Sequence, residues 1–113
     1  MIPDILHSLE KPDLFEKFKT QVYRDFELAG VIDYLPVIES NQLDHLKEAF
    51  FNSILKLEVS NALNNLLYRV DINEIQIKKA ALKDPSLSLQ HLLSELMIKR
   101  ILQKVVLKEL YSK

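Results

Sequence analysis

Hydrophobic and polar residues follow a helical periodicity most persistently between residues 40 and 70. The other segments are most simply explained as packing against this one. It is the longest segment that lacks both Pro and Gly and also keeps a helical periodicity throughout. On a helical wheel of about 100° per residue, the apolar side chains of its first half fall on one face and the polar ones on the opposite face. The apolar residues on that face are Leu43, Leu46, Phe50, Ile54 and Leu57. The pattern predicts an amphipathic helix.

The apolar face of this segment changes sides halfway along. In the second half the apolar residues centre about 150° away from Leu43 on the wheel. They are Leu55, Val59, Ala62, Leu63, Leu66, Leu67 and Val70. A helix over 40–70 would also be about 45 Å long, although a globule of this size has a radius of gyration of about 13 Å. The segment is therefore either broken between 56 and 60, with Ser60 as a cap, or one continuous rod buried on two flanks. Because no Gly or Pro occurs at the break, we predict the continuous rod.

The pattern before this segment predicts a helix over 12–29. Pro12 suits its first turn, an apolar stripe follows at helical spacing, and Gly30 is placed to end it in the left-handed conformation. A short helical turn is expected before Pro12. Between 31 and 39 the chain is apolar but contains Pro36, which predicts an extended connection lying on the core.

Two more helices are predicted after residue 70. Asp71 and Glu74 have the spacing of a capping box, which favours a helix over 72–83. The last helix is predicted over 86–112, with Asp84 or Ser88 as its cap.

The last helix repeats the change of apolar face. Its early apolar residues centre on one side of the wheel and its later ones about 180° away. The early group is Leu92, Leu93, Leu96 and Met97, and the later group is Ile98, Ile101, Leu102, Val105 and Val106. Arg100, Lys104 and Lys108 form a basic stripe at i, i+4 and i+8 where the first apolar face had been.

The sequence thus predicts an all-α fold, a single helical domain over 1–113 built as a bundle of four main helices, at least one of them long. Two long helices that both change faces are expected if part of each packs against a second copy. We therefore predict a homodimer, with exchanged helices as one form of it. Its contact is placed on the displaced faces, at Val59, Ala62, Leu63, Leu66, Ile98, Ile101, Leu102 and Val105. A monomer with broken helices, or a deep bundle that covers both sides, agrees with the same wheels.

Composition supports this class and limits the chemistry. Of 113 residues 48% are hydrophobic, one is Gly and none is Cys. The absence of Cys excludes disulfides and thiolate sites. Residues 1–75 carry 7 basic and 13 acidic side chains (net −6), whereas 76–113 carry 8 and 3 (net +5). Two explanations follow: the two parts pack together, or the second binds an acidic or phosphate-bearing partner.

No catalytic or metal site and no cofactor are predicted. His45 with Glu48, and His91 with Glu95, can each share a helical face, but no Glu-x-x-His pair of a di-iron helical bundle occurs. The lone Gly30 cannot build a nucleophile elbow or a phosphate loop. We therefore expect a protein that is not an enzyme.

The predicted function is a non-catalytic helical association module, an adaptor or structural protein that assembles with a second copy or with an unidentified protein. No segment has the pattern of a signal peptide or a membrane span, so a cytoplasmic protein without membrane partners is expected. The alternative is a nucleic-acid-associated regulator that uses Arg100, Lys104 and Lys108. The near-neutral net charge of −1 and the turn without Gly argue against it.

Overall fold

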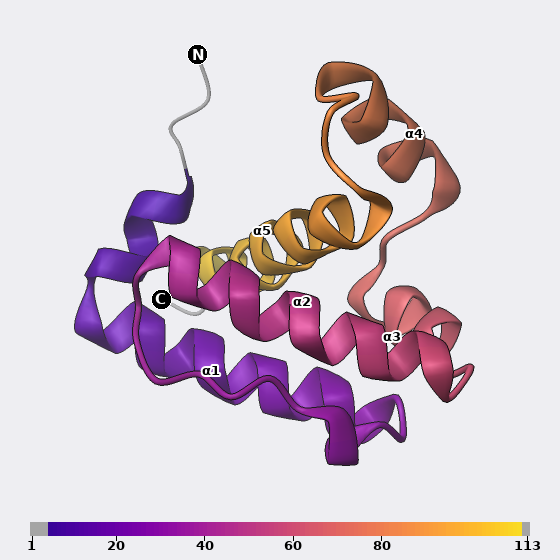
Figure 1. Cartoon of the computed structure of the whole chain (residues 1–113). Helices are drawn as coiled ribbons and strands as arrows, with labels where there is room; N and C mark the ends of the chain where they lie inside the picture. Colours follow the sequence, from indigo (N-terminus) through magenta and orange to yellow (C-terminus); the bar gives the residue numbers. More distant parts are fainter. Residues whose placement is uncertain (1–4, 112–113) are drawn as a thin grey trace.

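The computed structural model describes residues 5–111, and these fold into helices joined by short connections (Figure 1). The elements are η1 (Ile5–Glu10), α1 (Pro12–Leu28), η2 (Ile32–Tyr34), α2 (Leu43–Val59), α3 (Leu63–Val70), α4 (Glu74–Lys83) and α5 (Leu89–Tyr111), where η marks a 3-10 helix. No strand occurs within residues 5–111, so the predicted all-α class is confirmed.

The helix α5 is the element on which most of the others pack. Its most extensive contacts are with α2 and α1, and α4, η1 and α3 also touch it. Figure 1 shows it running behind α2. Both of its predicted apolar faces are covered inside the chain, because Leu93 and Met97 are as deeply buried as Ile101 and Leu102. A helix surrounded in this way needs apolar residues on several sides, which explains its change of face without a second copy.

The continuous rod predicted over 40–70 is wrong. The helix α2 ends at Val59 and α3 begins at Leu63, so the chain has five α-helices in its described part rather than four main ones. Asn61 lies between them in the left-handed conformation, with φ of 60°. The next residue closes the turn, because the N–H of Ala62 donates to the carbonyl of Leu57 at 2.9 Å. Asn tolerates this conformation better than other residues except Gly, so the helix ends there without Gly or Pro.

Gly30 ends α1 as predicted, with φ of 75°. Its N–H donates to Glu27 and that of Val31 donates to Phe26, at 3.0 and 2.9 Å. These two bonds form a Schellman motif, and the buried Val31 then returns the chain to the core.

The capping box predicted at Asp71 lies two residues further on. Asp71 instead ends α3 in the left-handed conformation, with φ of 71°. Asn73 caps α4: its side chain accepts from the N–H of Gln76 at 2.9 Å, and the Gln76 side chain accepts from the N–H of Asn73 at 2.8 Å. The same motif with Asn and Gln in place of Asp and Glu satisfies the same backbone groups.

Ser88, rather than Asp84, caps α5. Its hydroxyl oxygen accepts from the N–H of His91 at 3.2 Å, and the helix begins at Leu89.

The connection from η2 to α2 is extended, as Pro36 predicts, and runs back along α1 to the start of α2 (Figure 1). Pro36 is buried, and Leu35 and Ile38 pack against the core. The hydroxyl of Ser53 on α2 donates to the carbonyl of Tyr34 at 2.5 Å and fixes the start of the connection.

Candidate functional site

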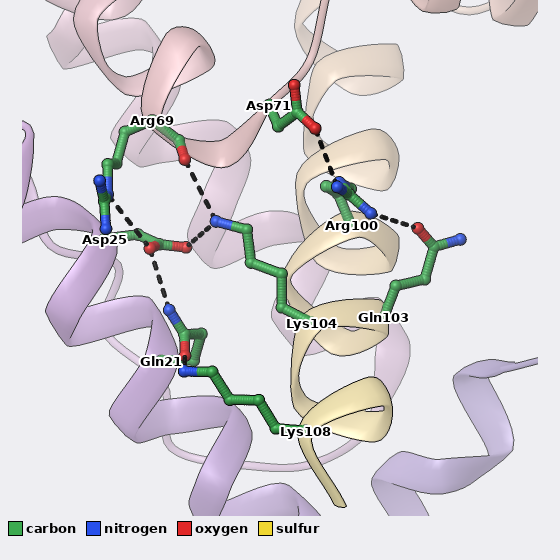
Figure 2. A network of polar contacts seen from close by, with 8 residues as sticks. All are labelled: Gln21, Asp25, Arg69, Asp71, Arg100, Gln103, Lys104 and Lys108. Carbon is green, nitrogen blue, oxygen red and sulfur yellow. Dashed lines mark hydrogen bonds and ion pairs between the residues drawn. The ribbon is translucent and has the colours of Figure 1, made fainter. Parts of the chain in front are cut away.

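A buried carboxylate on α1 lies at the centre of a polar network that connects three helices. Asp25 is fully buried. Its Oδ2 accepts from the Lys104 ammonium at 3.1 Å, and its Oδ1 accepts from the Gln21 amide at 3.0 Å (Figure 2). The Arg69 Nε lies 3.9 Å from Oδ1. A buried charge requires partners of this kind. Because the partners of Asp25 lie on α1, α3 and α5, the network joins these three helices.

The three residues of the predicted basic stripe all donate hydrogen bonds to other segments of the chain. Lys104 contacts Asp25, and Lys108 donates to the Gln21 side-chain oxygen at 3.0 Å. Arg100 donates to Asp71 at 2.9 Å (Figure 2). The stripe is thus engaged within the chain, and its use for an anionic partner stays a prediction. The stripe is part of how α5 is held to α1 and to the end of α3.

This arrangement accounts for the opposite charges of the two parts of the chain. Lys104 and Arg100 of the basic part pair with Asp25 and Asp71 of the acidic part. A third ion pair also joins the two parts, but here the cation belongs to the acidic part: Lys47 on α2 pairs with Glu95 on α5 at 2.9 Å. Of the two explanations of the charge pattern, packing of the two parts is the one these contacts support.

Most residues of the displaced apolar faces are already covered within the chain, so these faces do not provide the predicted contact with a second copy. Leu66, Ile98, Ile101, Leu102 and Val105 are buried, and Ala62 and Leu63 are partly buried against the same core. The exception is Val59, at the end of α2, which is 90% exposed. These faces cannot meet a second copy unless the chain opens, and the dimer itself stays a prediction.

His91 and Glu95, which share a helical face, each contact other residues. His91 lies within 2.6 Å of the Ser88 hydroxyl and stacks on Phe51, with ring centroids 4.3 Å apart. Glu95 is paired with Lys47 instead. Across residues 5–111 no group of three or more His, Asp or Glu side chains is arranged to hold a metal ion.

A groove of about 470 Å³ lies between the extended connection and α2. Polar side chains of α2, among them His45 and Glu48, form one wall, and the connection from Tyr34 to Ser40 forms the other. Both His45 and Glu48 are exposed. The lining of the groove therefore combines polar side chains of α2 with the partly apolar connection.

The outer face of α4 carries exposed apolar residues that were not predicted as a contact surface. This helix packs mainly on α5, and none of its residues is fully buried. Ile75 and Leu82 are 64% and 83% exposed and lie on one face at i and i+7. The poor periodicity of the segment was the signal that could have found it, because a short helix covered on one side leaves its other apolar residues in solvent.

None of the helices within residues 5–111 is both long and apolar enough to cross a membrane. Comparison of the chain with protein-family models, with curated proteins and with solved structures found no match.

Proposed function

We propose that the protein is a non-catalytic helical association module that assembles with a second copy of itself. The observation that carries this proposal is the outer face of α4, where Ile75 and Leu82 stand mostly in solvent. The position of the predicted contact therefore moves from the buried faces of α3 and α5 to α4.

The energetic reason is the apolar area left on α4. Fully burying an Ile or Leu side chain is worth about 1.5–3 kcal/mol relative to leaving it exposed. The helix α4 is packed on one side only and has two such residues on its other face. Their apolar area is enough to stabilise a weak contact but not a permanent interface. A concentration-dependent dimer is the expected form.

The alternative, a nucleic-acid-associated regulator, has less support. Arg100, Lys104 and Lys108 would have to leave Asp71, Asp25 and Gln21 to reach a phosphate. A filter-binding titration at low salt tests it, because phosphate contacts are strongest there.

The test of the proposed function is the mass of the protein in solution. Sedimentation velocity is measured from about 1 to 500 µM, the range in which a contact of about 4–8 kcal/mol becomes visible. The parent should shift from monomer to dimer, and Leu82→Ser should remain monomeric. Leu110→Ser is the matched control, because Leu110 is 65% exposed at the far end of α5. A parent that stays monomeric at the highest concentration refutes self-association.

A further inference from the structure

Two groups of exposed charged residues have no partner among residues 5–111. The acidic group is Asp33, Glu39, Asp44 and Glu48, and the basic group is Lys78, Lys79 and Lys83. Within the described part of the chain, none of the seven takes part in an ion pair or a side-chain hydrogen bond, whereas Lys47, Arg100 and Lys104 all do. The two groups have opposite signs.

Two members of the acidic group line the groove between the connection and α2, and the other two are next in sequence to residues of its lining. Glu39 and Glu48 line this groove together with Val37, which is 73% exposed. The cation in the lining is Lys56, so carboxylates outnumber it two to one. Asp33 and Asp44 are also exposed, in η2 and in the first turn of α2. The groove thus combines apolar surface with excess negative charge.

The basic group lies on the exposed side of α4. Lys78 and Lys79 fall beside Ile75 and Leu82 within an arc of about 100° on the helical wheel. Lys83 continues this arc at the end of the helix. This outer face therefore combines apolar surface with positive charge, which is the complement of the groove.

The two surfaces cannot meet within one chain. The helix α4 packs on α5, whereas the connection runs along α1 to the start of α2. Figure 1 shows them at separate ends of the molecule. Two copies placed side by side can bring them together, and a two-fold axis makes the contact twice.

From this complementarity we infer that the acidic groove of one copy binds the outer face of α4 of a second copy. The inference rests on the proposed self-association and names its two surfaces. The exposed aliphatic side chains of α4 supply apolar contact, and the charges orient the two copies. A contact between two α4 helices would instead place lysines against lysines.

Charge reversal on each surface tests the inference. The first variant is Lys78→Glu with Lys79→Glu, and the second is Glu39→Lys with Glu48→Lys. Each reversal places like charges across the contact, so each variant alone should raise the dimer dissociation constant by at least about tenfold. The matched control, Lys11→Glu with Lys99→Glu, reverses two exposed lysines elsewhere and should leave it unchanged.

Mixing the two reversed variants gives the decisive result. In the mixture one contact has its native charges and the other has both signs exchanged, so a heterodimer should form although neither variant dimerises alone. One chain that carries both reversals should dimerise like the parent. Circular dichroism checks that every variant keeps its helical content, as expected for substitutions of exposed residues.

The outcomes separate the inference from the proposed function. If the parent dimerises and both reversed variants dimerise equally well, the inference is wrong and self-association stands. If each variant is impaired but the mixture and the double variant are not restored, the two surfaces do not contact each other and the inference is also wrong. A parent that remains monomeric overturns the proposed function itself.

Discussion

Removing the Lys104 ammonium should destabilise the fold more than removing the Asp25 charge with which it pairs. The pair has an N–O distance of 3.1 Å, and the two side chains differ in exposure, 22% for Lys104 and 0% for Asp25. When the lysine is lost, the carboxylate stays buried without its nearest cation. When the carboxylate is neutralised, the lysine can turn its ammonium toward solvent.

The magnitude follows from the geometry. At 3.1 Å and an effective dielectric constant of about 20, the attraction between the two charges is about 5 kcal/mol, much of it offset by desolvation. Leaving one buried partner alone costs about 3–5 kcal/mol, and the nearby Arg69 guanidinium places Lys104→Met at the lower end, about 3 kcal/mol. Asp25→Asn keeps the shape and the bond from Gln21 and should cost about 1.5 kcal/mol.

Urea unfolding followed by circular dichroism measures both variants and the double variant. The free energies of unfolding complete a double-mutant cycle, in which the coupling between Asp25 and Lys104 should exceed about 1 kcal/mol. Lys99→Met is the control, because Lys99 is exposed on the same helix, and it should change stability by less than about 0.5 kcal/mol. An Asp25→Asn cost equal to or above that of Lys104→Met would refute the reasoning from unequal burial.

Five further substitutions at four positions test the helix ends and the core by the same unfolding assay. Asn61→Gly should keep or raise stability, whereas Asn61→Ala should lower it by about 1 kcal/mol, because its φ is positive; equal effects would contradict the turn. Gly30→Ala should cost about 1 kcal/mol for the backbone alone, since no atom lies within 4 Å of the added Cβ. Leu102→Ala should lower the free energy of unfolding by about 2–5 kcal/mol and Val59→Ala by under about 0.5 kcal/mol, because the first side chain is buried and the second exposed. Similar losses for the two variants would contradict this difference in burial.

Local patterns were enough to predict the class and most helix ends. The helical spacing of apolar residues predicted the helix after Pro12, the spacing of a capping box predicted the helix that ends at Lys83, and Gly30 marked a true end. Ser88 was one of the two predicted caps of the last helix, since a cap acts within three residues of its own position, and the structure decides for Ser88 over Asp84. The break at Asn61 was missed because Asn only tolerates the left-handed conformation that Gly adopts freely.

The sequence by itself determined where the chain is helical and which residues are apolar, since these properties depend on neighbours three or four residues away. Only the tertiary structure decided which apolar faces are covered and which charges are paired. Asp25 and Lys104 are 79 residues apart, so no periodicity links them. Likewise, the change of apolar face on α5 predicted one surface for its own chain and another for a second copy. Both surfaces belong to one core, because α1 and α2 both pack on α5. Burial and pairing are properties of contacts distant in sequence, and those contacts exist only once the helices have packed.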